Sequence, residues 1–480
     1  MKSKPNIILI VMDTVRADHL SCYGYHRKTS PNIDKLAEQG VLYEKAFTTA
    51  EWSPPSHASI FTGKYPSYHR VLGKNLLLNN ENTTIAEILA HHGYQTICVT
   101  RNDLIGYETN LSKGFQEYIL SLPTKSYKFI LPNLKNLFKT MIYGRDQNTY
   151  LTLEIVKKVL KNQRRSNKPF FLFINFLNCH ARYDPPRPFK ERFCNGFKES
   201  KLYLIDFFLM KTFGRTTEKI NDSNLDIQKI RYAATNYGQF SFMSGDLDIS
   251  NKEWDIIKSW YDGEISYLDH HIGQFITFLN EEDLLNDTLL IITSDHGENF
   301  GEHGLASHHF CLYDSLLHVP LILIYPDLIP KRKRISNIVS LVSIFPTILD
   351  LLNIKGYRNN IQGKSLAPFE NREIYDFICA ECGKSVSAAN VGKNSPLQKF
   401  RDKIQKFDVG FKCIRTEEYK YILSSNGKEE LYNLQDDPYE RVNLASKYPE
   451  KVKYLRDLLE KTLDISFFGS EEFPNNKYRK

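Results

Sequence analysis

The chain of 480 residues is long enough for more than one domain, and its 41% of hydrophobic residues is enough for a large core. The formal net charge of +7 is small for this length, so we expect no nucleic-acid partner, whereas a small anionic substrate is compatible with it. No stretch approaches the roughly 18 uninterrupted apolar residues of a membrane helix, and the apolar run at residues 7–12 is too short for a signal peptide. The eight cysteines show no repeated spacing, so we expect a reduced, cytoplasmic protein without a membrane span.

Apolar segments of strand length alternate with amphipathic segments along most of the chain. The pattern predicts strands at residues 6–12, 95–100, 169–176, 288–293 and 319–325, and helices at residues 33–39, 84–92, 254–280 and 342–352. Such alternation favours an α/β fold in which a mixed, mostly parallel sheet is sandwiched by helices. Ligands of these sheets bind outside the carboxyl ends of the strands, so polar residues at strand ends are candidates for a site.

Two segments interrupt this alternation, and the end of the chain departs from it. Residues 123–149 and 194–250 show weak periodicity, which favours insertions. From about residue 362 the chain changes to short strands and turns, with a hairpin signal at Ser425, Asn426 and Gly427. We therefore predict a large α/β domain at residues 1–361 and a small antiparallel α+β domain at residues 362–480.

The segment EWSPPSHASIFTG at residues 51–63 combines a hydroxyl nucleophile, a rigid turn and a helix start. Pro54 and Pro55 follow Ser53, and Ser56 is a good N-cap for a helix that begins at His57. Ser53 is then expected just before a helix N-terminus, where free backbone N–H groups and the helix dipole favour an anion. An ordinary proline-capped helix start is the alternative interpretation.

Chemistry-bearing side chains follow two of the predicted strands. Asp13 directly ends the first strand, and Asp295 and His296 follow the strand at residues 288–293. Two carboxylates and an imidazole from two strand ends predict a site for a divalent metal ion. Each aspartate taken singly could instead cap the next helix.

Blocks of the sequence resemble those of the sulfatases, within the alkaline phosphatase superfamily. They are NIILIVMDTVRADHLSCYGY, SPNIDKLAEQGVLYEKAFT, the Ser53 segment ending in TGKYPSYH, YDGEISYLDHHIG, DTLLIITSDHGENFGEHG, LYDSLLHVPLIL and EELYNLQDDPYERVNLA. The blocks occur in the order of the family between residue 6 and about residue 446. The resemblance implies an alkaline phosphatase-like fold, with residues 1–361 as the catalytic domain.

The resemblance also implies that residue 53 is the nucleophile. In sulfatases this residue is a Cys or Ser that is oxidised to formylglycine, in a motif with Pro at its third and Arg at its fifth position. Pro55 fits the motif, whereas His57, which we include among the catalytic residues, stands where Arg is expected. Formylglycine at Ser53 and a sulfatase-maturing enzyme as a partner are therefore open expectations.

The metal ligands implied by the resemblance are Asp13, Ser53, Asp295 and His296, with Thr14 as a further oxygen donor. Many sulfatases have a second Asp where this chain has Thr14. The set is therefore more similar to that of the phosphonate monoester hydrolase and phosphodiesterase branch. One divalent ion is expected, Ca²⁺ by family, with Mn²⁺ or Zn²⁺ as alternatives because a carboxylate is lost and His296 supplies nitrogen.

Four further residues correspond to positions of the family near the substrate. His180 matches a family histidine, and His308 stands where relatives have Lys or His near the leaving group, so both are candidate catalytic residues. Arg101 and Asn102 follow the strand at residues 95–100, where Asn is frequent in relatives, and are candidate substrate-binding residues. A packing or surface role is the alternative for each of the four.

The expected function is metal-dependent hydrolysis of a small anionic ester, sulfated or phosphorylated, with a sugar-linked ester as one possibility. Sulfate-ester hydrolysis is the first expectation. The alternatives are a phosphodiester or phosphonate monoester hydrolase, or a phosphoryl-group transferase, that uses unmodified Ser53. A non-catalytic binding protein on the same fold is a further alternative, which the presence of all the main candidate ligands disfavours.

Overall fold

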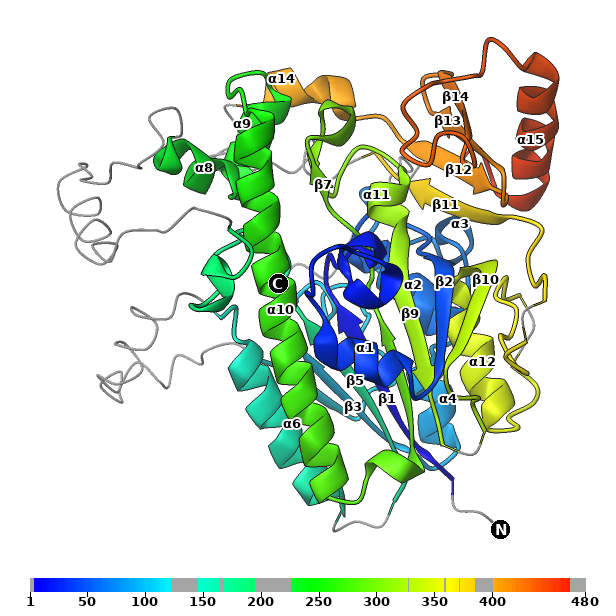
Figure 1. Ribbon diagram of the computed structural model, residues 1–480. Helices are drawn as coiled ribbons and strands as arrows, with labels where there is room; N and C mark the ends of the chain where they lie inside the picture. The colour runs from blue at the N-terminus through cyan, green and yellow to red at the C-terminus, as the bar shows by residue number, and fades with distance from the viewer. Residues whose placement is uncertain are drawn as a thin grey trace, which may run out of the picture.

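The computed structural model of the protein describes residues 4–121, 146–164, 168–194, 226–326, 328–357, 360–370, 372–384 and 400–466. Its centre is an eight-stranded sheet with the order β10-β2-β9-β6-β1-β5-β3-β4 (Figure 1). Strand β9 is antiparallel to both of its neighbours, and the other neighbouring pairs are parallel. The predicted mixed, mostly parallel sheet is confirmed.

The strands at the centre of the sheet are long apolar runs. In the register, Leu9 of β1 pairs with Phe173 of β5 on one side and with Ile291 of β6 on the other. Side chains of both faces are buried here, as expected where helices cover both sides of a sheet. The eight strands are β1 (Asn6–Met12), β2 (Val41–Phe47), β3 (Gln95–Thr100), β4 (Glu117–Leu120), β5 (Phe170–Phe176), β6 (Thr288–Thr293), β9 (His318–Ile324) and β10 (Lys333–Ser340).

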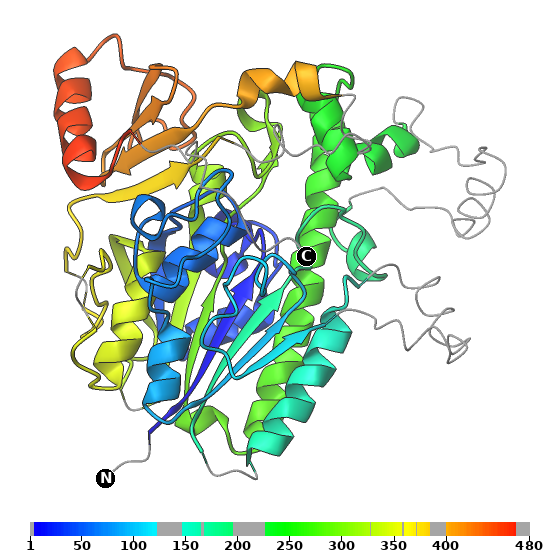
Figure 2. The ribbon, with the colours of Figure 1, turned by 180° about the vertical axis from the view of Figure 1, so that it is seen from behind.

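Helices cover both faces of the sheet (Figures 1 and 2). Successive side chains of β1 point to opposite faces, so Ile8 and Ile10 join one core and Ile7 and Leu9 join the other. The first core includes α1 (Pro31–Ala37), α6 (Thr149–Arg164) and the long α10 (Asn251–Glu281). The second includes α2 (Ser53–Thr62), α4 (Ile85–His91) and α12 (Ile344–Leu351).

A second, antiparallel sheet lies near the C-terminal end of the described chain, with the order β11-β12-β13-β14. Its strands are β11 (Ile378–Cys382), β12 (Phe411–Arg415), β13 (Tyr419–Ser424) and β14 (Glu429–Asn433), and α15 (Pro449–Thr462) packs on it. Gly427 takes φ +84° in the β13–β14 turn, as the hairpin signal indicates. The small antiparallel unit is confirmed, whereas a boundary between residues 361 and 362 stays a prediction.

The segments predicted as insertions are described only in part, because residues 122–145 and 195–225 lie outside the described ranges. The weak periodicity of residues 194–250 is misleading for their second half, which forms α8 (Ile227–Ala233) and α9 (Asn236–Met243). Side chains of Asp226 and Thr235 accept hydrogen bonds from the first turns of these helices, and such caps stabilise short helices. None of the described helices combines the length and the apolar character that crossing a membrane requires.

Candidate metal centre and active site

The carboxyl ends of β1 and β6 bring Asp13, Asp295 and His296 together. One ligand atom of each residue lies within 4.8 Å of the other two, and all three residues are fully buried. The two strands are parallel neighbours, so the chain leaves both at the same edge of the sheet. In the part of the chain that the structure describes, no second cluster of metal-ligating side chains is this close.

The donor atoms of this cluster fit a divalent cation. Burial and then the neighbouring Asp295 raise the pKa of Asp13, and burial raises the pKa of Asp295. Asp13 Oδ1 and Asp295 Oδ2 are buried and accept no hydrogen bond from any described residue. Two buried carboxylates with unused lone pairs, next to an imidazole, are unfavourable without a positive charge and suit a divalent metal ion.

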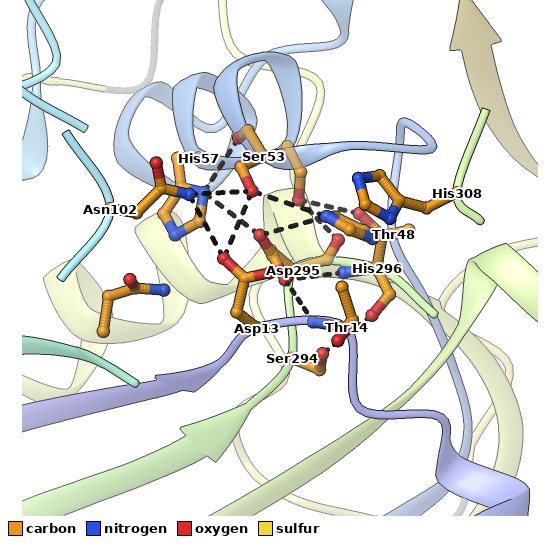
Figure 3. A network of polar contacts seen from close by, with 12 residues as sticks. Asp13, Thr14, Thr48, Ser53, His57, Asn102, Ser294, Asp295, His296 and His308 are labelled. Atoms are coloured by element: carbon orange, nitrogen blue, oxygen red, sulfur yellow. Dashed lines mark hydrogen bonds and ion pairs between the residues drawn. The ribbon is translucent and has the colours of Figure 1, made fainter. Parts of the chain in front are cut away.

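Ser53 lies beside the cluster (Figure 3). Its Oγ donates to Asp13 Oδ2 at 3.3 Å and lies 3.4 Å from His296 Nε2. Asn102 Nδ2 lies 3.2 Å from both Ser53 Oγ and Asp13 Oδ2, so it can donate to either oxygen. Asn102 follows β3, two strands away from β1 in the sheet, and its role in substrate binding stays a prediction.

Helix α2 begins earlier than the sequence predicts. It starts at Ser53 with Trp52 as the N-cap, and Pro54 and Pro55 occupy its first turn. Prolines are tolerated there because the first N–H groups of a helix have no intrahelical partner. The predicted N-cap role of Ser56 is wrong, and its hydroxyl instead donates to the Asp295 carbonyl oxygen at 2.7 Å.

The position of these prolines also corrects the expected anion site. Pro54 and Pro55 lack the N–H groups that we expected to be free beside Ser53. The helix dipole still places positive potential at this end of α2. The donor that the structure places beside Ser53 Oγ is therefore the Asn102 side chain, at 3.2 Å, and not a backbone N–H of Pro54 or Pro55.

Thr14 holds Asp295 through its backbone. Its N–H donates to Asp295 Oδ1 at 3.2 Å, and its carbonyl oxygen accepts from Tyr261 at 2.7 Å. The backbone takes φ +60°, an unusual value for a β-branched residue and one that is found at functional sites. Thr14 Oγ1 is buried without a partner among the described residues, so it is free to contact a metal ion.

His57 lies one turn after Ser53 on α2. Its ring is fully buried against Phe61 and Phe173, and Nδ1 lies 2.8 Å from the Ser53 carbonyl oxygen. Nε2 is buried and has no hydrogen-bond partner in the described ranges. The imidazole is therefore packed between α2 and Phe173 of β5, and its catalytic role stays a prediction.

The two other histidines meet at the same edge of the sheet. The ring centroid of His308 lies 4.9 Å from that of His180 and 4.6 Å from that of His296. Glu298, which sequence patterns did not single out, has its Oε1 3.3 Å from His308 Nδ1. Burial lowers the pKa of His308, and burial raises the pKa of Glu298 to about 7. The only sequence signal for Glu298 is its place two residues after His296 in the SDHGE stretch.

Two arginines near the site differ in their contacts. No hydrogen bond or ion pair joins Arg101 to the metal cluster within the described part of the chain, and its buried Nε has no partner there. Arg16, which was not predicted, donates to the Glu298 carbonyl oxygen at 3.0 Å, to Glu302 at 2.8 Å and to Asp18. It thereby ties the loop after β1 to the loop after β6.

A mostly parallel sheet with a buried carboxylate and imidazole cluster beside a hydroxyl at its carboxyl edge defines a hydrolase of the sulfatase type. Residues 5–354 match the family model described as Sulfatase, and the chain belongs to this family. It is 26% identical to an arylsulfatase of Clostridium perfringens, an alignment that covers 98% of this chain and 95% of the relative. It is 25% identical to an N-acetylglucosamine-6-O-sulfatase of Bacteroides thetaiotaomicron, with 96% and 86% covered.

Solved structures show the same fold. The structure of BT4656 in complex with its substrate D-glucosamine-2-N,6-O-disulfate has a TM-score of 0.71 and 22% identity, and covers 98% of this chain and 100% of that chain. The phosphonate monoester hydrolase of Agrobacterium radiobacter has a TM-score of 0.70 and 23% identity, with 95% of both chains covered. The expected fold and its resemblance to sulfatases are confirmed.

Proposed function

We propose that the protein is a metal-dependent hydrolase of sulfate esters in which residue 53, as formylglycine, is the nucleophile. The observation that carries this proposal is the position of Ser53 Oγ, 3.3 Å from Asp13 Oδ2 and 3.4 Å from His296 Nε2. A nucleophile inside a candidate ligand cluster is suited to activation by metal coordination. The relatives named as sulfatases support a sulfate ester as the substrate.

The residues that would hold one divalent ion are Asp13, Asp295 and His296, together with the oxygens of residue 53 and Thr14. Ca²⁺ is the proposed ion, with Mn²⁺ or Zn²⁺ as alternatives because His296 supplies nitrogen. When bound, such an ion lowers the pKa of a coordinated hydroxyl and stabilises negative charge on the ester. Asn102 orients the oxygen of residue 53 by donating to it. His308 and His180 are proposed to protonate the leaving oxygen. The negative charge of a bound ester would raise the pKa of His308 and so offset the lowering that burial causes.

The chemistry of residue 53 distinguishes hydrolysis of sulfate esters from hydrolysis of phosphoesters. A serine that accepts a sulfuryl group becomes a stable alkyl sulfate, which water releases slowly. The hydrate of formylglycine has a second hydroxyl that can expel sulfate as the aldehyde forms again. A phosphorylated serine can be hydrolysed in line by water, so unmodified Ser53 is sufficient for phosphoesters.

A second candidate function follows from the departure at His57. Because His57 replaces the Arg of the maturation motif, Ser53 could stay unmodified. The enzyme would then be a phosphodiester or phosphonate monoester hydrolase or a phosphoryl-group transferase. A protein of the same fold, the phosphonate monoester hydrolase of Agrobacterium radiobacter, makes this the specific alternative.

The deciding experiment is the mass of the tryptic peptide of residues 46–64, measured together with turnover. Protein with the aldehyde is expected to hydrolyse 4-nitrophenyl sulfate repeatedly. Protein with intact Ser53 is expected to prefer phosphodiesters and to give at most one turnover on the sulfate ester. Rapid repeated turnover of the sulfate ester by protein with unmodified Ser53 would contradict the proposal.

The proposed compartment is the cytoplasm. All eight cysteines of the chain are free thiols in the structure; six of them lie in the buried cores, and Cys22 and Cys194 pack against one of these cores. Free thiols are usual where glutathione and thioredoxin keep cysteines reduced. The proposed partners are a small anionic ester, with a sulfated sugar as one form, and a sulfatase-maturing enzyme.

A further inference from the structure

The rings of Trp52 and His309 contact each other beside the candidate active site, and each residue is the sequence neighbour of a candidate catalytic residue. Trp52 precedes Ser53 and is the N-cap of α2, and His309 follows His308. Their ring centroids are 6.3 Å apart at an interplanar angle of 66°. The His309 ring also lies 4.6 Å from that of His308, which in turn lies 4.6 Å from His296. A continuous row of aromatic rings therefore extends outward from the metal cluster.

The segment that carries His308 and His309 is held in an unusual backbone conformation. Ser307 and Phe310, on either side of the two histidines, take φ +68° and φ +70°. Such left-handed conformations cost free energy for residues other than glycine and persist where surrounding contacts fix them. The His309 ring stacks on Phe240 of α9, at 16° and 6.4 Å, and the Phe310 ring stacks on Phe407. These contacts from distant segments fix the direction of the His309 ring.

Trp52 and His309 are both partly exposed and keep unused polar atoms. No described residue forms a hydrogen bond with the indole Nε1 or with either His309 nitrogen, and none of these atoms is sealed in the core. Burial and then the neighbouring His308 lower the pKa of His309, so its imidazole is neutral near neutral pH. This surface therefore offers aromatic faces, N–H donors and one acceptor, without charge.

We propose that Trp52 and His309 form a subsite for the alcohol part of the ester, and that this part is an uncharged ring with hydroxyl groups, such as a pyranose. The apolar face of a pyranose packs on an aromatic ring, and its hydroxyls pair with free donors and acceptors at the ring edges. The row of rings begins at His296, which lies 3.4 Å from Ser53 Oγ, and passes through His308, the proposed proton donor, so it lies where the leaving group would extend. The inference rests on the proposed function and assigns part of the substrate specificity to these two residues.

The three tryptophans of the chain allow a direct binding test. Trp254 and Trp260 are buried, at 5% and 1% exposure, so Trp52 is the tryptophan that a ligand can reach. N-acetylglucosamine 6-O-sulfate is titrated into the non-turnover variant Ser53→Ala. A saturable change in tryptophan fluorescence is expected, and Trp52→Phe in the same background is expected to abolish it. A saturable change that survives in Trp52→Phe, or no change in either protein, would overturn the subsite.

The kinetic test compares substrates that share the sulfate group. With N-acetylglucosamine 6-O-sulfate, Trp52→Ala and His309→Ala are expected to lower kcat/KM by at least about 10-fold, chiefly through KM. With 2-hydroxyethyl sulfate, which has no ring, the loss is expected to stay within about 2-fold. The control Tyr439→Ala, a 64% exposed aromatic in the C-terminal part, is expected to change neither substrate.

Any other pattern of kinetic losses would contradict the proposed sugar subsite. Equal losses on both sulfate esters would show that Trp52 supports the fold of the site and binds no ring. A loss that is confined to 4-nitrophenyl sulfate would assign the subsite to aryl esters and overturn the pyranose. If wild-type protein hydrolyses none of these esters, the proposed function fails, and the fluorescence titration alone then decides whether the sugar binds at Trp52.

Discussion

His57 Nδ1 lies 3.6 Å from Asp295 Oδ2, while the same nitrogen contacts the Ser53 carbonyl oxygen at 2.8 Å. One buried imidazole thus stands between the helix that carries the proposed nucleophile and a proposed metal ligand. Its ring packs in T-shaped contacts against Phe61 and Phe173, so its position is fixed by packing as well as by polar contacts.

Replacement of His57 by Ala is expected to lower the free energy of unfolding by about 2–4 kcal/mol, because a fully buried ring is lost and a cavity remains. Urea unfolding of the metal-free protein measures this change. His57→Gln, which keeps an N–H donor but not the ring, separates the polar contact from the packing. Wild-type stability of His57→Ala would contradict the packing role.

Lys420 joins the two sheets of the protein through a buried ion cluster. It lies on β13, is fully buried, and contacts Asp314 of α11 (Asp314–Leu317) at 2.8 Å and Glu440 at 2.7 Å. Lys420→Met leaves the buried Glu440 carboxylate without its cation and leaves Asp314 with Arg415 alone, at 3.2 Å, so we expect a loss of about 3–5 kcal/mol in the free energy of unfolding.

The matched control for this prediction is Lys428→Met. The Lys428 side chain is 69% exposed and pairs with Glu430 at 3.2 Å. An exposed pair of this kind contributes about 0–1 kcal/mol. Similar losses for the two variants, measured by urea unfolding, would show that the buried cluster does not stabilise the contact between the sheets.

His69 makes the stability of the fold dependent on pH. Val71 N–H donates to His69 Nδ1 at 3.1 Å, and Nε2 lies 3.0 Å from Ser59 Oγ, so the buried ring is neutral with its proton on Nε2. Burial, and then Lys64, lower its pKa to about 3. The unfolded chain therefore binds one more proton between these pKa values, and stability falls as the pH drops below about 6.5.

The expected size of this effect is about 1.5–2 kcal/mol between about pH 6.5 and about pH 5. Urea unfolding at the two pH values measures it. His69→Gln keeps a donor for Ser59 but does not titrate. Between the two pH values, the variant should therefore lose about 1.5–2 kcal/mol less unfolding free energy than the wild type. An equal pH dependence in the wild type and in His69→Gln would show that folding does not lower the pKa of His69.

Strand ends were predictable where the strand is a continuous apolar run. Strands β1 and β6 begin and end at the predicted residues, because each is buried on both faces and is followed by polar residues. Strands β2, β4 and β10 were not predicted. Strands β4 and β10 lie at the edges of the sheet, where partly exposed positions tolerate charged residues such as Lys333 and Arg334 and interrupt the apolar run.

The candidate metal cluster was predictable for the same reason, since Asp13, Asp295 and His296 each follow a recognisable strand. The contacts of His308 with Glu298 and of Trp52 with His309 were not. They join loops whose relative positions depend on packing by α9 and on unusual backbone conformations, and no local pattern of residues encodes either.

The proposed role of His308 predicts a dependence on the leaving group. An alkoxide needs a proton as it leaves, whereas a nitrophenolate does not, so a general acid contributes about 10²- to 10⁴-fold only for the first kind. His308→Ala is expected to reduce kcat/KM on alkyl esters by this range and on nitrophenyl esters by much less. Steady-state kinetics on both ester types measures the difference, and equal losses would show that His308 only binds the substrate.

Asp13→Asn tests the metal centre without relying on turnover. In the metal-free protein, Asp13 and Asp295 are two buried carboxylates, and the charge of Asp295 disfavours ionisation of Asp13. Removal of one charge is therefore expected to raise the Tm. The same change removes a ligand and should abolish the increase in Tm that added Ca²⁺ or Mn²⁺ produces. That increase corresponds to about 2.7 kcal/mol when the free ion is at 100 times its Kd.

Thermal unfolding with and without the ion, with metal analysis, measures both effects. Asp287→Asn, which removes an exposed carboxylate next to the other end of β6, is the control and should change neither. An undiminished metal-dependent increase in Asp13→Asn would show that the ion binds elsewhere.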